Sequence, residues 1–362
     1  MDVSGYAPTR PTDLPPRVLL LLDRDSDGGR PIQEALRSHG CQVVAVPRSA
    51  VAADPRSVSL LDVDLVLGYG PHNGSLLALR TLEDRARGLT ARPVFAWWLL
   101  ENLPNPAWPD RLALFLSACR LRADSWLDRL GTGWEGHVES WLRAGQRVRI
   151  LGELRRLARE GGCDLIVAAS GARACYLRRH GIEAAVIPFG YVEQFGRDLS
   201  LERDIPVAFL GQLHSRRRRH LLSRLGASLG RRGISLNVVS PTRALEGQER
   251  THFLNRCVVL INVLKQPQDS VGHRLLLGAA NKALIVSEPM RDCEWLEPGR
   301  HLVVVPFEHM ADTVCHYLSH PEERGAITEA AYRLVTEELT LHRQVGRLLA
   351  LAEPRRLRSA AS

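Results

Sequence analysis

Short apolar runs alternate with longer amphipathic stretches along nearly the whole chain of 362 residues. The first half contains, among others, RVLLLLD at 17–23, QVVAVP at 42–47 and PVFAWWLL at 93–100. A short, continuous apolar run is typical of a parallel strand whose two faces are both buried. Because helical patterns separate the runs, the sequence predicts βαβ units that build open parallel sheets covered by helices.

The alternation is interrupted once, so the chain is predicted to form two α/β domains. Residues 188–204 show little periodicity, mixed charges and two glycines, and a second alternating series follows them. The length fits two domains of ordinary size. We expect two doubly wound, Rossmann-like domains that face a cleft, with Gly190 and Gly196 absorbing hinge motion at low backbone cost. The predicted parts are an N-terminal arm at 1–16, a first domain at 17–190, an interdomain linker at 191–204, a second domain at 205–352 and a basic tail at 353–362.

The composition is that of a soluble globular protein. Hydrophobic residues make up 45% and charged residues 24% of the chain, which excludes a wholly disordered protein. No uncharged apolar run reaches the ~18 residues of a membrane-spanning helix, and the N-terminus lacks the basic segment of a signal peptide. The seven cysteines are scattered without a CxxC pair, which predicts reduced thiols and a cytoplasmic location.

The formal net charge is +8, and arginine supplies almost all of the basic residues. An arginine excess is compatible with anionic partners, although a GC-rich genome gives the same composition. The run Arg216–Arg219 lacks the interleaved aromatic residues that stack on bases, so no nucleic-acid partner is predicted. We expect this run to be a solvated helix face from which only Arg216 reaches a ligand.

The sequence motifs of several large enzyme classes are absent. There is no GxGxxG after the first apolar run, no GxxxxGK[ST] and no GxSxG, which argues against dinucleotide oxidoreductases, P-loop NTPases and α/β-hydrolases. The alternating aspartates of 23–27 and Glu34 have the spacing of a calcium loop. The apolar run before them favours a βα turn instead, in which Gly28 and Gly29 let a ligand approach the backbone. No metal site is predicted.

Three segments of the second half, 207–225, 260–288 and 293–324, carry a more specific signal. Their order and spacing resemble the C-terminal domain of GT-B glycosyltransferases, closest to the CgeB-like group. The phrase IPFGYVEQF at 187–195 resembles the interdomain phrase of that family. The resemblance covers residues 185–345, and the first half agrees in architecture only. The matching positions are Phe209, Gly211, Asn262, Arg274, Glu294, Pro298, Gly299, Tyr317, Leu318, His320, Pro321, Glu322, Glu323 and Arg324.

The resemblance implies that the protein transfers a sugar from a nucleotide-sugar donor to an acceptor in the cleft, with no further cofactor and no obligatory metal ion. In open α/β sheets, ligands bind beyond the carboxyl ends of the strands, where a diphosphate leaving group needs cations or N–H donors. Arg274 is the principal candidate because it opens a helix after a polar loop; the alternative is a salt bridge to another segment. Backbone N–H groups near Gly211 are expected to assist. The predicted donor-binding residues are Gly211, His214, Arg216, Ser240, Lys265, Ser270, His273, Arg274, Glu288 and Glu294.

Two positions depart from the family pattern R-x-f-E-x-x-a-x-G. Leu277 stands where the family has the glutamate that is thought to hold the ribose, and Lys282 stands where it has glycine. Leucine accepts no hydrogen bond from a ribose hydroxyl, and Glu288, at the end of the next apolar run, is the candidate substitute. The departure leaves a second hypothesis open, in which the protein is a catalytically degenerate GT-B-like protein that binds a nucleotide or assembles with a partner. The oligomeric state is not predicted.

Two loops of the first half, 68–75 and 96–108, carry candidate residues for the acceptor and the base. A carboxylate or an imidazole can take the proton of an acceptor hydroxyl, so Glu101 and His72 are the predicted catalytic residues. The alternatives are a helix cap or rim salt bridge for Glu101 and turn chemistry for His72. The tryptophans of the second loop either stack on a sugar or belong to the core. The predicted acceptor-binding residues are Gly28, Gly29, Asn73 and Asn102.

Overall fold

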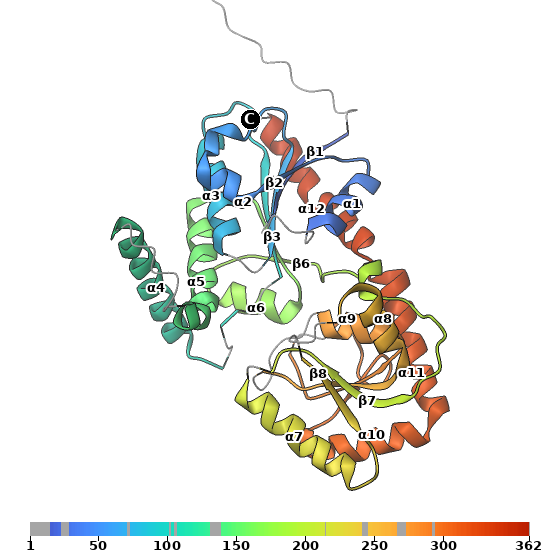
Figure 1. Cartoon of the computed structure of the whole chain (residues 1–362). Helices are drawn as coiled ribbons and strands as arrows, with labels where there is room; N and C mark the ends of the chain where they lie inside the picture. Colours follow the sequence, from blue (N-terminus) through green and yellow to red (C-terminus); the bar gives the residue numbers. More distant parts are fainter. Residues whose placement is uncertain are drawn as a thin grey trace, which may run out of the picture. The chain divides into compact units, whose positions relative to one another are not determined.

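The computed structural model contains two compact α/β units (Figure 1). The first consists of the chain up to Ile187 together with the residues from Gln344 onward, and the second is Pro188–Arg343. No helix among the described residues is long and apolar enough to cross a membrane. The described residues are 15–22, 29–70, 73–100, 103–104, 107–130, 139–213, 215–240, 245–265, 273–291 and 294–361.

The first unit is built on a six-stranded sheet with the order β2-β1-β3-β4-β5-β6, in which every pair of neighbours is parallel. Strands β3 and β4 are buried along their whole length, as their continuous apolar sequences predict. The chain order reverses between β1 and β3, which is the pattern of a doubly wound sheet. The strands are β1 (Arg17–Leu22), β2 (Gln42–Pro47), β3 (Leu65–Gly70), β4 (Val94–Leu99), β5 (Leu165–Ala168) and β6 (Ala185–Val186).

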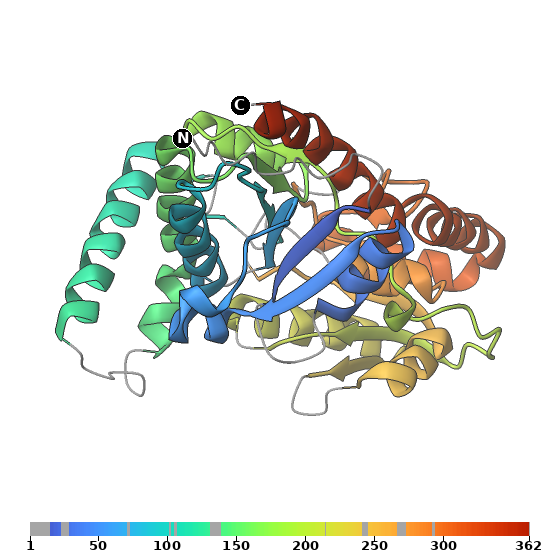
Figure 2. The same ribbon diagram turned by 90° about the horizontal axis from the view of Figure 1, so that it is seen from above.

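Helices cover both faces of this sheet, with α3 and α5 on one face and α1 and α12 on the other (Figure 1). Helices α4 and α5 pack against each other as a long pair (Figure 2). Trp97 and Trp98 of β4 are 1% and 0% exposed and belong to the core, whereas Trp108 is 41% exposed. The helices of the unit are α1 (Arg30–Ser38), α2 (Arg48–Ala53), α3 (Asn73–Ala86), α4 (Asp110–Leu130), α5 (Glu139–Glu160), α6 (Gly171–Arg179) and the greater part of α12 (Leu341–Ala361).

The second unit is built on a five-stranded parallel sheet with the order β11-β10-β9-β7-β8. Side chains of β7 alternate between two apolar layers: Val207 and Phe209 pack with α7 and α10, and Ala208 packs with Leu254 of α8. The chain order reverses between β7 and β9, so the second sheet is doubly wound as well. The elements are β7 (Ile205–Leu210), α7 (Arg216–Gly230), β8 (Leu236–Val239), α8 (Gly247–Arg256), β9 (Cys257–Asn262), α9 (His273–Ala280), β10 (Leu284–Ser287), β11 (Val303–Val304), α10 (Met310–Ser319) and α11 (Pro321–Arg333).

Two doubly wound α/β units confirm the predicted fold class. The points where the two chain orders reverse lie between β1 and β3 in one sheet and between β7 and β9 in the other. Ligands of doubly wound sheets bind beyond the carboxyl ends of the strands at such a point. The loops after β1, β3, β7 and β9 are therefore the places where this rule puts a functional site.

Residues 191–204, predicted as a linker, are packed as part of the second unit. The amide of Asn255 donates to Arg197 O at 2.8 Å and its Oδ1 accepts from the Leu199 N–H at 2.7 Å, while the amide of Asn281 donates to Phe195 O at 2.8 Å. Gly196 has a φ of +111°, and a Cβ there would lie 2.3 Å from Oδ1 of Asn281. This glycine therefore serves close packing within the unit, and hydrogen bonds attach the segment to the second unit.

The C-terminal residues predicted as a basic tail belong to α12, which runs to Ala361. Residues from Gln344 onward are grouped with the first unit, although the sequence places the end of the second domain at 352. Two contacts account for the grouping. A Cβ on Gly346 would lie 2.9 Å from the ring of His39, and Nε of Arg355 donates to Asp164 O at 2.9 Å.

Candidate functional site

The carboxyl ends of β7, β9 and β10 bring several predicted residues to one edge of the second sheet. Gly211 follows the last residue of β7, and Asn262 ends β9 opposite Ser287 at the end of β10. Asn262 is fully buried, and its amide donates to the Ser287 hydroxyl at 2.8 Å. Arg274, in the first turn of α9, extends toward this edge.

The guanidinium of Arg274 lies across the strand ends in a fixed orientation. Its Nε donates to Leu210 O at 2.8 Å, and Nη1 donates to Oδ1 of Asn262 at 2.5 Å. Cζ of Arg274 lies 4.6 Å from the centroid of the Phe209 ring. A Cβ on Gly211 would lie 2.3 Å from Nη2 of Arg274, so this position requires glycine. Gly211 thus contributes space; its N–H already donates to Val239 O at 3.0 Å.

Arg274 is a half-buried cation whose side-chain hydrogen bonds go to neutral partners. Burial and, to a smaller extent, the positive charge of the neighbouring Arg218 together lower its pKa to about 9. The Arg218 guanidinium lies over the same Phe209 ring and donates to Val263 O and Gln212 O, both at 2.9 Å. Among the described residues, no carboxylate pairs with Arg274. A buried cation without a counter-ion favours the binding of an anion, because the anion restores charge balance in a poorly solvated place.

The arginine run at the start of α7 is only partly the solvated face that the sequence predicts: Arg216 and Arg219 are exposed, whereas Arg217 is half-buried and Arg218 is buried. Nη1 of Arg219 donates to Leu213 O at 2.6 Å, and Arg218 is only 4% exposed. Arg217 forms a two-point pair with Glu288 and donates to Leu264 O at 3.0 Å. The prediction is wrong for Arg217 and Arg218, because their side chains bind the loops that follow the strands.

Glu288 is fully engaged by protein groups. It is 5% exposed, and besides Arg217 its Oε2 accepts from the Leu264 N–H at 2.8 Å. These bonds hold together the loops after β9 and β10 at the edge where Arg274 lies. The contacts of the described residues therefore give Glu288 a structural role at the sheet edge where Arg274 lies.

His273, the first residue of α9, places its imidazole against two aromatic rings that also contact each other. The centroid of its ring lies 5.8 Å from that of Phe189 and 5.5 Å from that of Phe195. Although part of the residue is exposed, burial lowers the pKa of His273, and the positive charge of Arg250 lowers it further. At neutral pH the ring is therefore neutral and offers a hydrogen bond rather than a charge.

The two positions that depart from the family pattern have clear surroundings. Leu277 is 8% exposed and packs in an apolar cluster with Cys257 and Leu260. Lys282 has a φ of +51°, a conformation that favours glycine, and its amine pairs with Asp198 at 3.0 Å and Glu329 at 2.8 Å. The backbone at 282 thus keeps the geometry that a glycine there provides, whereas position 277 has become a core position.

The remaining predicted residues are distributed over both units. In the second unit, Lys265 and Glu294 are exposed, and Ser240 is half-buried next to the end of β8. In the first unit, Gly29 is buried, and a Cβ on it would lie 2.3 Å from the Leu22 side chain, so glycine lets α1 start close to β1. Asn73 is the first residue of α3. The residues that lie outside the described part of the chain are Gly28, His72, Glu101, Asn102, His214 and Ser270.

Sequence reasoning missed Arg217 and Arg218, although a signal for them exists. Cations in the first turn of a helix oppose the helix dipole, and no acidic residue in that turn of α7 compensates them. An unfavourable placement of this kind indicates another role for the side chains. Here the N-cap Ser215 accepts from the Arg218 N–H at 3.4 Å and donates to Lys265 O at 3.0 Å, which fixes the start of α7 beside the strand ends.

Comparisons with known proteins agree with this arrangement. Residues 215–350 match a family model described as glycosyl transferase-like. A comparison with curated proteins gives no match. Among solved structures, HepE (Alr3699) of Anabaena in complex with UDP and glucose superposes with a TM-score of 0.62, at 10% identity over 93% of this chain and 99% of that chain. The chain has the GT-B fold.

Two further structures show how widely this fold is used. An alpha-glucosyltransferase in complex with UDP-glucose and DNA containing an abasic site has a TM-score of 0.54, at 8% identity over 93% of this chain and 99% of that chain. A UDP-N-acetylglucosamine 2-epimerase has a TM-score of 0.52, at 8% identity over 92% of this chain and 95% of that chain. Because the GT-B fold carries both transfer and epimerisation, the function has to be argued from the residues of the site.

Proposed function

We propose that this protein is a glycosyltransferase of the CgeB-like group, which transfers a sugar from a nucleotide-sugar donor to an acceptor. The observation that carries the proposal is the half-buried guanidinium of Arg274, which is fixed at the strand ends and has no paired carboxylate among the described residues. The diphosphate of a donor would supply the missing anion. The glycosyl transferase-like match over 215–350 supports the same function.

Arg274 would act mainly on the leaving group. As the bond to the sugar breaks, negative charge grows on the diphosphate oxygen, and a cation fixed beside it stabilises the transition state more than the ground state. Leu210 O and Asn262 orient the guanidinium before any ligand arrives, so little reorganisation is needed. This step requires no metal ion.

In the first unit, the loops after β3 and β4 would supply the base and the acceptor site. We assign the base to Glu101 or His72, because a carboxylate or a neutral imidazole can take the proton of an acceptor hydroxyl. The acceptor itself is not identified by these residues. The residues proposed to contact it are Gly28, Gly29, Asn73 and Asn102.

Calorimetric titration of the full chain with UDP, GDP and dTDP tests the donor site. UDP is the first choice because the structures similar to this chain hold UDP or UDP-glucose. Arg274→Ala should weaken binding by about 10- to 100-fold, the equivalent of a charge-assisted hydrogen bond. Arg232→Ala is the matched control, because Arg232 follows the opposite end of α7 and pairs there with Asp312. The proposal is overturned if none of the three nucleotides binds to the wild-type protein.

The position of Leu277 favours a second candidate function. Its burial in an apolar cluster leaves no carboxylate at 277 to hold a ribose, which fits a degenerate protein that binds a nucleotide without turnover. Incubation with UDP-glucose separates the two. A transferase is supported if the wild-type protein releases UDP from UDP-glucose and Arg274→Ala does not. The degenerate protein is supported if the nucleotide binds but no UDP is released with any of a range of acceptors.

A further inference from the structure

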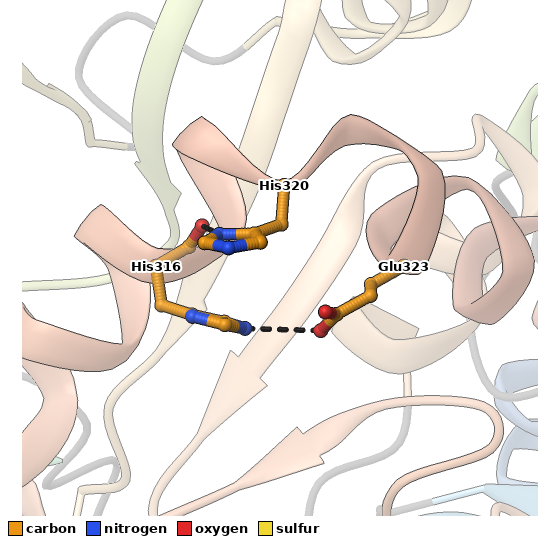
Figure 3. Close-up of side chains that lie close together, drawn as sticks. All are labelled: His316, His320 and Glu323. Carbon is orange, nitrogen blue, oxygen red and sulfur yellow. Dashed lines mark hydrogen bonds and ion pairs between the residues drawn. The ribbon is translucent and has the colours of Figure 1, made fainter.

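Three side chains that can ligate metal ions gather at the junction of α10 and α11 (Figure 3). His316 lies in the last turn of α10, His320 is the residue between the two helices, and Glu323 lies in the first turn of α11. One ligand atom from each residue lies within 4.8 Å of the others, and all three residues are exposed. None of them belongs to the donor site described above.

The local sequence explains why these side chains meet. His316 and His320 are separated by four residues, a spacing that places side chains on one face of a helix. Their rings stack with centroids 4.0 Å apart and an interplanar angle of 20°. Pro321 starts α11 immediately after His320, and the turn between the helices brings Glu323 back toward His316 (Figure 3).

Hydrogen bonding prepares His320 to act as a ligand. Its Nδ1 lies 2.7 Å from the backbone oxygen of His316. A carbonyl oxygen only accepts, so Nδ1 carries the hydrogen, and in the neutral ring Nε2 keeps its lone pair. A histidine that donates its second N–H to a backbone carbonyl is the usual arrangement in metal sites, because this bond fixes the tautomer and the ring orientation.

His316 and Glu323 are already held at a distance that suits a shared metal ion. Nε2 of His316 donates to Oε2 of Glu323 at 3.0 Å. A metal ion entering between the two groups would bind Nε2 of the neutral His316 ring, and the hydrogen that Nε2 carries would move through solvent to Nδ1.

We propose that His316, His320 and Glu323 form a binding site for a borderline divalent transition-metal ion, for which Zn²⁺ is the reference. Two imidazole nitrogens and one carboxylate suit Zn²⁺, Ni²⁺ or Cu²⁺, whereas Mg²⁺ and Ca²⁺ take oxygen ligands. Ligands of a tetrahedral Zn²⁺ at about 2.1 Å lie about 3.4 Å apart, so only small movements of exposed side chains are needed. Three protein ligands leave the fourth position to water or to an external group.

The proposed site lies away from the strand ends where the donor is expected. Arg232, just after the C-terminus of α7, contacts Asp312 and Cys315 of α10. Arg218, in the first turn of the same helix, reaches the strand ends instead. Because α7 has fifteen residues, its two ends are about 20 Å apart, and the metal site can be removed without touching Arg274.

Titration of the full chain, without an affinity tag, with ZnCl₂ tests the proposal. We expect one ion to bind per chain. In other metal sites, loss of a residue that only hydrogen-bonds to a ligand weakens metal binding by about 10- to 100-fold. Because His316→Ala and His320→Ala each remove a ligand itself, each should weaken binding by at least this factor. Glu322→Gln and His252→Ala are matched controls, because each alters an exposed residue of the same type as a proposed ligand.

Each outcome of the titration decides the proposal. The site is supported if one Zn²⁺ ion binds per wild-type chain, if His316→Ala, His320→Ala and Glu323→Gln all weaken this binding, and if both controls bind as wild type does. No binding to the wild-type protein, or equal binding to wild type and His316→Ala, overturns it. Thermal unfolding gives a second measurement: Zn²⁺ should raise the melting temperature of wild type and of the controls but not of His316→Ala.

Discussion

Replacing Gly211 by alanine tests the packing that holds Arg274 at the strand end. Gly211 has a φ of +151°, which L side chains rarely adopt, and an added Cβ would lie 2.3 Å from Nη2 of Arg274. The backbone conformation alone costs about 1–3 kcal/mol. Displacing the guanidinium also weakens a hydrogen bond from a charged donor, worth about 1.5–3 kcal/mol. We therefore expect Gly211→Ala to lower the free energy of unfolding of the second unit by about 2–4 kcal/mol.

Thermal unfolding measures this loss of stability, and a second glycine-to-alanine substitution that should raise stability is the matched control. A unit of this size changes its melting temperature by about 2–4 °C per kcal/mol, so Gly211→Ala should melt at least about 4 °C below wild type. Gly226 lies inside α7, and the nearest atom to an added Cβ there is 3.7 Å away. Gly226→Ala should raise stability by about 0.5–1 kcal/mol, the usual gain in a helix. Equal melting temperatures of Gly211→Ala and wild type would refute the packing argument.

Three further substitutions test other contacts. Glu288→Gln removes the charge from the pair with Arg217 and should lower the free energy of unfolding in urea by about 1–3 kcal/mol. Glu297→Gln, in the exposed pair with Arg300, should lower it by less than about 1 kcal/mol. Equal losses in the two variants contradict the role of burial. Because burial lowers the pKa of His273, the unfolded chain binds its proton first, and stability should fall as the pH drops below about 6.5. His273→Gln should reduce this fall in the urea midpoint, and an unchanged pH dependence contradicts the assignment. Asn281→Ala should speed amide exchange in residues 193–199, which its side chain holds in place; unchanged exchange there shows that other contacts suffice.

The alternation of apolar runs predicted the fold because each run is a strand buried on both faces. Residues 191–204 were harder to place, since their structure depends on Asn255 and Asn281, more than fifty residues later in the chain. A segment held by distant side chains has no periodicity of its own. For the same reason the sequence could not show that the end of α12 is held at Asp164 O by Arg355.

The candidate site was predictable where position along a strand decides it. Gly211, Asn262 and Arg274 follow or end apolar runs, and the carboxyl ends of neighbouring parallel strands necessarily meet at one edge. Charge alone misled at Arg217 and Arg218, because solvent is the commonest neighbour of an arginine. Their place in the first turn of a helix was the better guide.

The two departures from the family pattern affect different ends of a bound nucleotide. Lys282 has a φ of +51°, and its amine pairs with two carboxylates. The backbone after α9 therefore has the conformation that a glycine at this position would adopt. Arg274 at the start of the same helix keeps its place at the strand ends. Only position 277 has lost a polar group, and Glu288 is committed to Arg217 and the Leu264 N–H. If this edge binds a nucleotide diphosphate, most of the attraction acts on the diphosphate and little on the ribose, and discrimination among nucleosides has to come from other residues.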